Sequence, residues 1–415
     1  MSQMRLSLAK VGVLILDKYI DRGTTIKHSF DSMPNHGLKI ILSELNQPYE
    51  FCHASDMNNY ETVICSLISV MDIENLIYSM ERFAPHNHTY QLIVGGFGVC
   101  NVKLIANYID VAVFGRGEGQ INKVIAGEIL PNVWRKDNDP LFTNTYTMRK
   151  PQYLCKDEVN VGCRNKCKFC FYSWARGNLN VSDSYHPGKT LNIPEDDWNR
   201  VVVDKPGRFI TAWDGWSEDT RRKVNKPVTN QGIIDKLKGI HELQLDKAVV
   251  LKTYQIVGYP WETADSVQHD IDEIVRLLKD CDPINDMTKI FIMFKVNVFG
   301  PEPLTPMQYD AADIYTKWRD ILRLKLYDGR NIKATILPMI DSPYTLMKRI
   351  MIHRAELGDI EMFKQIVFSS ELKKLPAMQK VDWLLKYGYI KKELFEIVDH
   401  ISADYLKIDG MPPYR

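Results

Sequence analysis

Residues 162–174 read GCRNKCKFCFYSW and place three of the chain's eight cysteines within eight positions, at Cys163, Cys167 and Cys170. Three thiols cannot all pair with one another as disulfides because their number is odd, and they lie too close together to act as three structural bridges. The other cysteines stand singly along the chain, with no framework spacing. The triplet therefore indicates metal ligation or reactive thiol chemistry.

The composition is that of an ordinary globular protein. Its 415 residues allow about two to four domains of ~100–200 residues each, and an apolar fraction of 45% is ample for buried cores. A net charge of +1 gives no whole-molecule reason to expect a polyanionic partner. Lys10 interrupts the apolar stretch near the N-terminus and no small-residue cleavage site follows, so this stretch predicts a strand and not a signal peptide. No run approaches the ~18 apolar residues that span a bilayer, so we expect a cytoplasmic protein with no membrane partner.

Strand and helix patterns alternate through residues 1–130. This alternation is typical of right-handed βαβ crossovers and predicts a doubly wound, Rossmann-like parallel sheet. Ligands bind such sheets at the carboxyl ends of the strands, where several glycines fall, although tight βα turns explain the same glycines. Strand patterns cover 11–17, 62–69, 90–96 and 110–119, and helical patterns cover 36–45, 72–83, 101–109 and 121–129.

The rest of the chain divides into three further parts. Residues 131–150 lack periodicity and carry two prolines, so we interpret them as a linker. Residues 151–340 alternate again and predict a separate α/β unit, whereas residues 341–415 predict a helical C-terminal domain. The second series has strand patterns at 158–162, 208–215, 249–260 and 289–300 and a helix at 264–280; the last region has helical patterns at 345–356, 360–368, 378–388 and 391–401.

The strand pattern at 158–162 delivers its carboxyl end to Cys163, and lysine and arginine residues surround the three thiols. These cations favour the thiolate forms that bind metal. A structural zinc site normally has four protein ligands, so zinc would also require Cys155 or a distant histidine. Three thiolates instead suit a cubane iron–sulfur cluster whose fourth iron stays open, because most clusters that only carry electrons use four thiolates.

With this spacing the chain resembles the radical S-adenosylmethionine (SAM) enzymes. Their signature Cys-x3-Cys-x-aromatic-Cys is matched by the three cysteines together with Phe169. YQIVGYPWET at 254–263 looks like the family's strand ending in Gly-x-Pro-x-Glu-Thr, and VNVFGPEPLTPMQ at 296–308 resembles its Phe-x-Pro-x-Pro-x-Thr-Pro stretch. The resemblance implies a partial (β/α)6 barrel within residues 151–340, with a [4Fe–4S] cluster on the three cysteines at the top of the first strand.

The chemistry that the resemblance implies depends on the open iron. SAM chelates that iron, an electron from the reduced cluster cleaves a C–S bond of SAM, and the resulting 5′-deoxyadenosyl radical abstracts hydrogen from a C–H bond. The resemblance also implies an external reductant such as flavodoxin or ferredoxin. The cofactors carry the difficult step and the protein positions them, so no catalytic side chain beyond the cluster ligands follows from the sequence.

The residues expected on the SAM side come from these motifs and from positions just beyond the strands. Ser217 has a second interpretation as a helix cap, and Glu262 as a favourable charge beside a helix N-terminus. Trp174, Trp213 and Trp216 would stack on an aromatic substrate or fill the core. The predicted SAM contacts are Phe169, Asp214, Ser217, Glu218, Arg221, Ile256, Gly258 and Glu262.

Residues 1–130 are similar to the cobalamin-binding domain that precedes this core in one subgroup of the family. The similarity rests on SLIS at 66–69, VGG at 94–96 and DVAVFGRGEGQI at 110–121. The cobalamin-ligand motif Asp-x-His-x-x-Gly does not follow the first strand, so the sequence leaves cobalamin binding open. The residues that would face the corrin are Ser66, Gly95, Gly96 and Gly117.

One leading function and two alternatives follow. We expect a radical SAM enzyme that abstracts hydrogen for rearrangement or modification of a small-molecule, amino-acid-derived or nucleotide-borne substrate. The alternatives are a cobalamin-dependent radical SAM methyltransferase and a non-catalytic iron–sulfur protein. The sequence does not reveal the substrate, and basic residues in the C-terminal helices leave nucleic-acid binding open beside a simple packing role.

Overall fold

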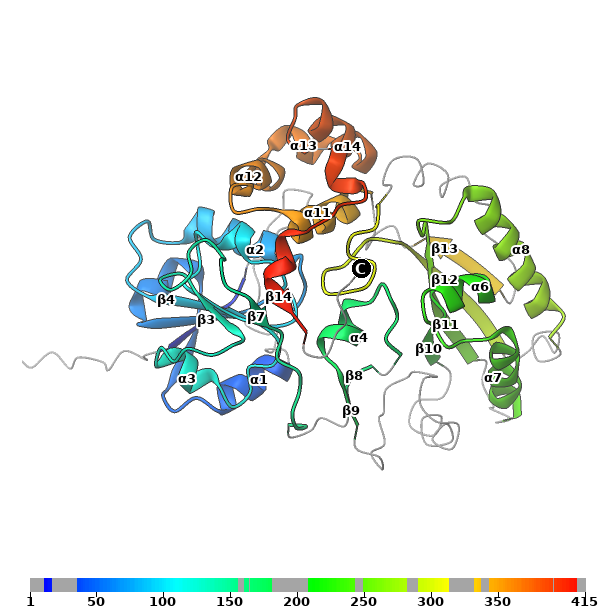
Figure 1. Cartoon of the computed structure of the whole chain (residues 1–415), viewed down its shortest axis with the longest axis horizontal. Helices are drawn as coiled ribbons and strands as arrows, with labels where there is room; N and C mark the ends of the chain where they lie inside the picture. The colour runs from blue at the N-terminus through cyan, green and yellow to red at the C-terminus, as the bar shows by residue number, and fades with distance from the viewer. Residues whose placement is uncertain are drawn as a thin grey trace, which may run out of the picture.

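The structure is a computed structural model that shows two separate sheets and a C-terminal group of helices (Figure 1). The loop that carries the cysteines lies between the two sheets, next to helix α4 (Phe171–Ala175). No helix in the part of the chain that is described is long and apolar enough to cross a membrane. The described residues are 11–16, 36–155, 160–163, 165–180, 208–242, 249–281, 290–312, 332–336, 343–390 and 392–408.

The N-terminal sheet has six strands and is parallel except at one edge. Its order is β2-β1-β3-β4-β5-β6, with β6 antiparallel to β5. This mostly parallel α/β arrangement agrees with the predicted Rossmann-like class. The strands are β1 (Val11–Leu14), β2 (Tyr49–Cys52), β3 (Thr62–Ser66), β4 (Gln91–Gly95), β5 (Val111–Val113) and β6 (Val133–Arg135), and the helices are α1 (His36–Ser43), α2 (Asp72–Phe83) and α3 (Ile121–Ile125).

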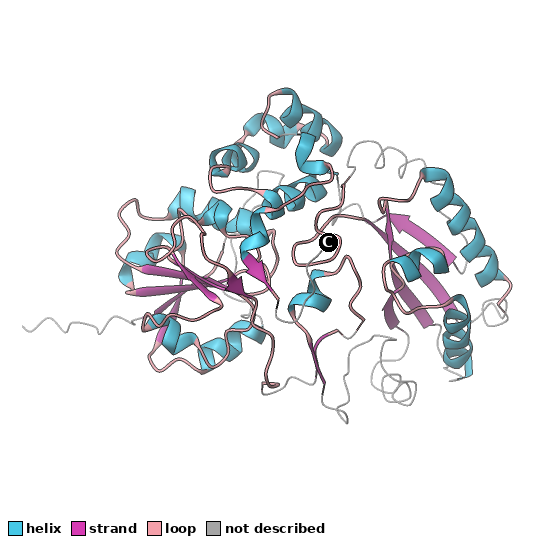
Figure 2. Ribbon diagram, viewed as in Figure 1, coloured by secondary structure: helices cyan, strands magenta, loops and turns pink. Residues whose placement is uncertain are grey.

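Helices cover both faces of this sheet, which explains why its inner strands β1, β3, β4 and β5 are mostly apolar (Figure 2). Successive side chains of a strand point to opposite faces. On β3, Val63 and Cys65 belong to the same core cluster as Leu76 of α2, whereas Ile64 packs with Ile41 of α1. Helix α2 is buried on more than one side: Leu76 and Ile77 belong to the core of the sheet, whereas Glu74 and Tyr78 contact the C-terminal helices.

Three N-terminal segments differ from the sequence prediction. Residues 101–109 form only a short 3-10 turn, η2 (Lys103–Ile105), in place of a helix. The edge strand β2 was not predicted because Tyr49 and Phe51 are exposed, which leaves no buried pattern to detect. Residues 133–135, placed in the linker, form β6, whose Trp134 is fully buried; three residues are too few to show a period.

The central sheet has four described strands, all parallel, in the order β10-β11-β12-β13. It agrees with the predicted second α/β unit, but it does not establish a six-stranded barrel. The strand before the cysteines, β8 (Asn160–Gly162), pairs antiparallel with β9 (Asn178–Asn180) and not with this sheet. The elements are β10 (Arg208–Ala212), β11 (Val249–Val257), β12 (Ile290–Val298), β13 (Ile332–Ile336), α6 (Glu218–Lys223), α7 (Asn230–Glu242) and α8 (Ala264–Lys279).

The two faces of the central sheet are different. Buried and half-buried positions alternate strictly along β11 and β12. The buried face packs in one core with apolar residues of α7 and α8, such as Leu237 and Ile274. The opposite face is half-buried.

The C-terminal region is helical, with one short strand at its end. Residues 391–401 were predicted as a helix, yet their described helical part is the 3-10 turn η4 (Lys392–Phe395). Strand β14 (Leu406–Lys407) pairs parallel with β7 (Tyr146–Thr147), so this region returns to the N-terminal half of the chain. The helices are α11 (Pro343–Arg354), α12 (Ile360–Phe368), α13 (Ser370–Lys374) and α14 (Ala377–Lys386).

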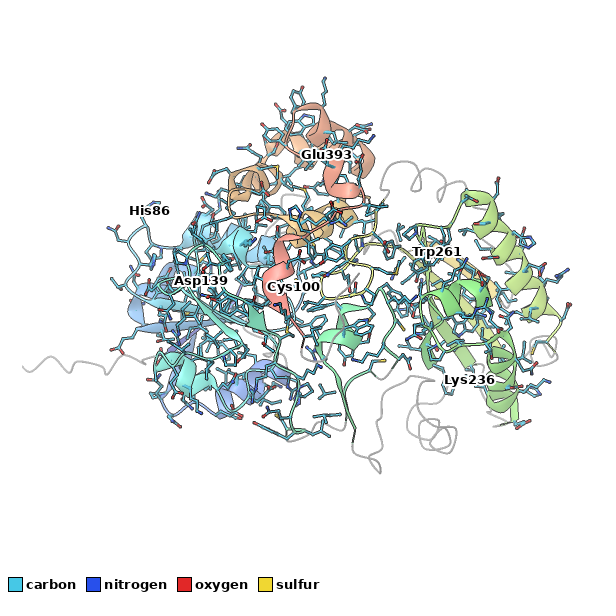
Figure 3. All side chains as sticks on the ribbon, in the orientation of Figure 1. His86, Cys100, Asp139, Lys236, Trp261 and Glu393 are labelled. Carbon is cyan, nitrogen blue, oxygen red and sulfur yellow. The ribbon has the colours of Figure 1, made fainter. Side chains whose placement is uncertain are left out.

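Buried polar contacts hold the C-terminal region against the N-terminal domain. Lys348 of α11 forms an ion pair with Glu74 of α2 at 2.9 Å, and both side chains are almost completely buried. The Sγ of Cys100 lies 3.6 Å from Nδ1 of His353, and Figure 3 places Cys100 at this junction. The Asn101 side chain donates to the carbonyl of Ile352 at 2.7 Å. These two parts of the chain therefore pack as one unit.

Candidate active site

The cysteine loop begins at a close crossing of two chain segments. Gly162 has φ +83°, and a Cβ on it would lie 1.9 Å from the carbonyl oxygen of Gly177, so only glycine fits there. The next amide, of Cys163, donates to the same oxygen at 3.0 Å. Further along, the Trp174 indole donates to the carbonyl of Cys167 at 2.8 Å. The tryptophan that sequence reasoning offered as a stacking residue thus supports the loop.

The three motifs that carry the family resemblance meet at this loop. Lys168 accepts a hydrogen bond from the amide of Met307, in the third motif, at 3.2 Å. Phe169 lies 6.0 Å, ring to ring, from Tyr259 in the second motif. Residues of all three motifs share one small apolar cluster with Val224; they are Phe169, Ile256, Tyr259, Phe299 and Met307.

Burial controls the protonation of two of the cysteines. Burial raises the pKa of Cys167 to about 12; Lys226 opposes this shift, and Asp214 and the two neighbouring thiols add to it. Burial also raises the pKa of Cys170 to about 11, assisted by the Glu302 carboxylate. Both thiols are therefore protonated at neutral pH, and a metal that binds them displaces those protons. The lysine and arginine residues that the sequence places near these thiols lower their pKa by less than burial raises it.

The chemical type of the ligands suits an iron–sulfur cluster, because three thiols share one loop with apolar neighbours. However, within the described residues no three His, Cys, Asp or Glu side chains are gathered closely enough to hold a metal ion. The predicted cluster site therefore remains a prediction.

A buried ion pair lies beside the cysteines. Lys226 Nζ is 2.7 Å from Asp214 Oδ2, and 6% and 12% of the two side chains are exposed. Burial alone would lower the pKa of Lys226, but Asp214 and the Cys167 thiol outweigh it and raise that pKa. The Tyr259 hydroxyl donates to the Asp214 carbonyl at 2.8 Å, which ties the pair to the second motif. Sequence reasoning found Asp214 but missed Lys226, because a single lysine in a loop carries no periodic signal.

Glu262 holds the turn that follows β11. Its Oε2 accepts from the amides of Gly258 at 2.7 Å and Tyr259 at 3.0 Å. Helix α8 begins after Thr263, whose side chain caps it, so Glu262 does not act in the first helical turn as one interpretation suggested. Gly258 takes φ +83°, which glycine adopts without strain. Both residues shape the turn beside the cysteine loop.

The three remaining predicted SAM contacts, Ser217, Glu218 and Arg221, interact with other parts of the central unit and not with the cysteine loop. The Ser217 hydroxyl accepts from the amide of Thr220 and caps α6, as its second interpretation proposed. Arg221 is fully buried and donates to the carbonyls of Gly215, Trp216 and Val228, which is a structural role. Glu218 lines a separate cavity of about 450 Å³ beneath α8. The structure therefore groups Phe169, Asp214, Ile256, Gly258 and Glu262 near the cysteines, but not these three residues.

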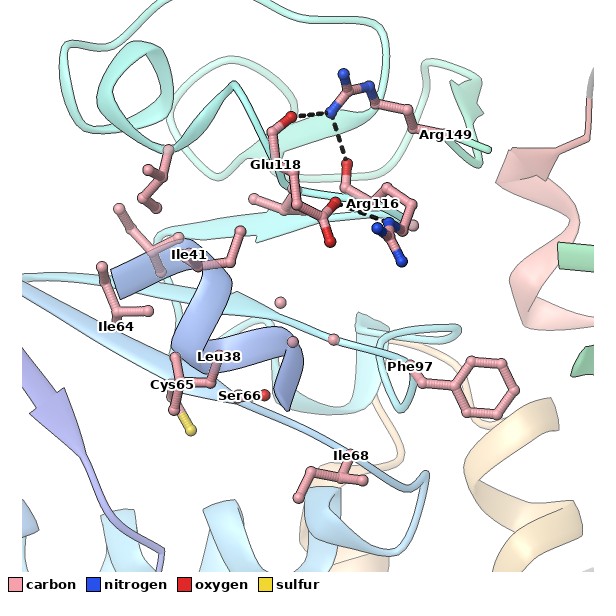
Figure 4. A pocket seen from close by; sticks show the side chains of 18 of the residues that line it. Leu38, Ile41, Ile64, Cys65, Ser66, Ile68, Phe97, Arg116, Glu118 and Arg149 are labelled. Atoms are coloured by element: carbon pink, nitrogen blue, oxygen red, sulfur yellow. Dashed lines mark hydrogen bonds and ion pairs between the residues drawn. The ribbon is translucent and has the colours of Figure 1, made fainter. Parts of the chain in front are cut away.

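A second cavity, of about 250 Å³, lies at the carboxyl ends of the N-terminal strands (Figure 4). It contains all four residues predicted to face a corrin: Ser66, Gly95, Gly96 and Gly117. Apolar side chains such as Leu38, Ile41 and Ile64 form much of its wall. The cavity is also lined by Phe171, Ala175 and Arg176 of the segment that follows Cys170. One cavity thus connects the N-terminal sheet with the end of the cysteine loop.

The charges on this cavity are mainly positive. Arg116, Arg149 and Arg176 line it together with one carboxylate, Glu118, which pairs with Arg116 at 2.9 Å. Arg149 donates to the carbonyls of Arg116 and Glu118, so it is held in place (Figure 4). Arg176 lies 4.7 Å from the centre of the Phe97 ring.

The cavity passes a simple test of fit for a large cofactor. A Cβ on Gly95 or Gly117 would meet Val113 at 3.8 Å or Ile41 at 3.2 Å, and both of these residues line the cavity. Side chains at either position would therefore enter space that the glycines leave open. Because the volume is slightly below the ~300–1,000 Å³ of pockets for drug-sized ligands, a tetrapyrrole would fill it and extend beyond it.

Comparison with known proteins gives distant structural neighbours. No protein-family model and no curated protein sequence matches the chain. Three solved structures of the cobalamin-dependent S-adenosylmethionine radical enzyme OxsB are similar, each at 12% identity: the apo protein (TM-score 0.26), the aqua-cobalamin complex (0.29) and the complex with aqua-cobalamin and SAM (0.28). The matches cover 93%, 93% and 96% of this chain and 62%, 62% and 60% of the OxsB chains. The chain thus spans less than two thirds of the length of these neighbours.

Proposed function

We propose that this chain is a radical SAM enzyme that abstracts hydrogen from a C–H bond of its substrate. One observation carries the proposal: three motifs that lie at 163–170, 254–263 and 296–308 in the sequence pack together in one apolar cluster around the cysteine loop. Motifs that together bind one cofactor must lie close together in the folded protein. Their convergence supports a common site.

The roles of the residues follow from this arrangement. Cys163, Cys167 and Cys170 would hold a [4Fe–4S] cluster, which, when bound, supplies the electron that cleaves SAM to a 5′-deoxyadenosyl radical. Phe169 and Ile256 offer an apolar surface beside the loop. Glu262 fixes the Gly258–Tyr259 turn through two amide hydrogen bonds, so this turn is preorganised to receive a ligand. Lys226 places a positive charge next to the thiols.

A cobalamin-dependent methyl transfer is the second candidate, and the cavity at the N-terminal sheet favours it. All four predicted corrin-facing residues line that cavity, and so do three residues of the segment after Cys170. A cofactor bound there would lie beside the cysteine loop. The simple hydrogen abstraction remains our first proposal because the buried polar pair Asp214–Lys226 and the clamped turn lie in the central unit.

The test is reductive cleavage of SAM by protein reconstituted anaerobically with iron and sulfide. Replacing Cys163, Cys167 or Cys170 by alanine should abolish iron loading and formation of 5′-deoxyadenosine together. Cys281, which is buried away from the loop in the main core, is the matched control, and Cys155 tests for a fourth thiolate. Loss of iron in the Cys155 variant would support a four-ligand site and contradict the open-iron mechanism. Retained iron without 5′-deoxyadenosine would favour a non-catalytic iron–sulfur protein.

Added hydroxocobalamin separates the two candidate reactions. Protein that retains the corrin after desalting, and transfers a methyl group from SAM, acts by the second candidate. Protein that forms 5′-deoxyadenosine equally well with and without cobalamin acts by the first.

A further inference from the structure

Arg176 lines the cavity at the carboxyl ends of the N-terminal strands without a polar partner for its guanidinium among the described residues. The guanidinium lies over two aromatic rings, 4.7 Å from the centre of the Phe97 ring and 5.3 Å from that of Tyr172. These contacts hold the group in place but use none of its N–H donors. The donors are therefore available to a bound molecule.

The other charged side chains on this cavity add to the positive charge. Arg116 is neutralised by Glu118 at 2.9 Å. The Arg149 side chain donates to the carbonyls of Arg116 and Glu118, which bear no net charge. Glu118 is the one carboxylate among the described lining residues, so the charges of Arg149 and Arg176 are not offset there. A cleft lined by one sign of charge concentrates ligands of the opposite sign.

The rest of the cavity wall is largely apolar, and its volume suits a small molecule. Leu38, Ile41 and Ile64 lie on one side, with Phe97 across from them (Figure 4). The volume of about 250 Å³ is slightly below the ~300–1,000 Å³ of pockets for drug-sized ligands, so a smaller molecule fits completely. Wall and charge together favour a molecule with an apolar body and an anionic end group.

A molecule in this cavity would contact both ends of the segment that follows the cysteine loop. Phe171, the first residue of that segment, lines the cavity and packs against Phe97 with 4.7 Å between the ring centres. At the other end Arg176 precedes Gly177, whose carbonyl accepts from the Cys163 amide at 3.0 Å. An anion held by Arg176 would thus lie next to a backbone contact of the cysteine loop.

We infer that this cavity binds a small anionic substrate, whose carboxylate or phosphate group pairs with Arg176 and whose apolar part lies against Leu38 and Ile41. A guanidinium forms charge-assisted hydrogen bonds with such oxyanions, often two in parallel. The inference rests on the proposed hydrogen abstraction, because it treats the cavity as the substrate side of the radical site. Cobalamin would occupy the same space, so the substrate and the corrin exclude each other.

Ligand-observed NMR on the intact chain, without added iron or SAM, tests the inference. The probes are octanoate, octyl phosphate and neutral octanol, which share a linear alkyl chain and differ in the end group. At least one anion should bind about tenfold more tightly than octanol, which is the gain expected from a hydrogen bond between charged groups. The anion that binds more tightly identifies the preferred end group.

Two substitutions locate the binding in this cavity. Arg176→Gln should abolish the advantage of the anion over octanol, and Arg176→Lys should retain part of it. Gly95→Leu should weaken the binding of all three probes, because a Cβ on Gly95 would have only Val113 nearby, at 3.8 Å, and the added side chain would enter the cavity. Arg222→Gln is the matched control and should bind as the wild-type chain does, since the Arg222 side chain is 76% exposed on α6.

Equal binding of octanol and both anions, or an anion advantage that persists in Arg176→Gln, overturns the inference. Binding that Gly95→Leu leaves unchanged also overturns it, as does hydroxocobalamin that stays bound after desalting and that neither anion displaces. The two proposals fail separately. Anion binding without any 5′-deoxyadenosine from the reconstituted wild-type chain leaves the anion site and removes the radical function, whereas 5′-deoxyadenosine without anion binding removes only the anion site.

Discussion

At the scale of single residues, some side chains that were predicted to contact SAM instead form hydrogen bonds within the protein. Glu262 and Arg221 were both predicted to contact SAM, yet Glu262 accepts from two backbone amides, and Arg221 donates to backbone carbonyls and to the Asn230 side chain. The two residues differ in where they lie relative to the cysteine loop. Glu262 clamps a turn beside the cysteine loop, so it shapes the site indirectly, while Arg221 holds a loop that faces α7. Motif matching cannot separate these roles because it records residue type and not the partner.

Replacing Glu262 by alanine should destabilise the protein by about 1–3 kcal/mol. The change leaves the buried amides of Gly258 and Tyr259 without their acceptor, which costs the desolvation of those groups. Urea unfolding measures the loss, and Glu262→Gln should restore part of it because the amide oxygen still accepts. Glu273→Ala on the exposed side of α8 is the control and should change stability by less than about 0.5 kcal/mol. A Glu262→Ala protein as stable as the wild type contradicts the clamp.

At the scale of elements, the sequence predicted the long, periodic segments well. Residues 72–83 form the predicted helix, and 249–257 and 290–298 form long strands where the pattern placed them. Short or irregular pieces were missed, such as β6, because three residues carry no period and its pairing depends on distant β5. The convergence of the four corrin-facing residues was predictable, since carboxyl ends of parallel strands meet at one edge. The contact of that edge with the segment after Cys170 was not, because it joins separate units.

The carboxyl end of β4 offers a clean test of the N-terminal cavity. Gly96 is unsuitable, since it takes φ +106° and a Cβ would lie 2.5 Å from the Leu67 carbonyl oxygen. Gly95→Leu adds a side chain to the cavity without that strain. If the cavity holds cobalamin, this variant should lose corrin binding at least tenfold by absorbance after desalting, while its iron content stays unchanged. Gly358→Leu, in an open turn, is the control. Undiminished corrin binding by Gly95→Leu would place the corrin elsewhere.

At the scale of the whole molecule, the C-terminal region is attached to the N-terminal domain and also reaches the cysteine loop. Arg349 of α11 pairs with Glu302 at 2.9 Å, and Glu302 accepts from the amide of Phe171, directly after Cys170. This chain of contacts links α11 to the start of α4. The sequence showed only that this region is helical, and the docking surface of its helices depends on buried pairs such as Lys348 with Glu74.

The two ion pairs between α2 and the C-terminal helices should differ strongly in energy. Lys348→Met leaves the Glu74 carboxylate buried without its partner and should cost about 3–5 kcal/mol. Lys364→Met removes a pair with Glu81 that is partly exposed and should cost at most about 1 kcal/mol. Urea unfolding of both variants measures the difference, and Glu74→Gln combined with Lys348→Met should recover part of the loss. Equal effects of the two substitutions contradict the buried interface.

The proposed open coordination position at the three-cysteine site is tested most directly by electron paramagnetic resonance of the reduced, reconstituted protein with and without SAM. Three thiolates from Cys163, Cys167 and Cys170 would leave one iron of the proposed [4Fe–4S] cluster without a protein ligand. Addition of SAM should therefore change the spectrum of the reduced cluster, and the Cys155→Ala protein should respond in the same way. A spectrum that SAM leaves unchanged in the wild-type chain, or a cluster that requires Cys155, contradicts the assignment.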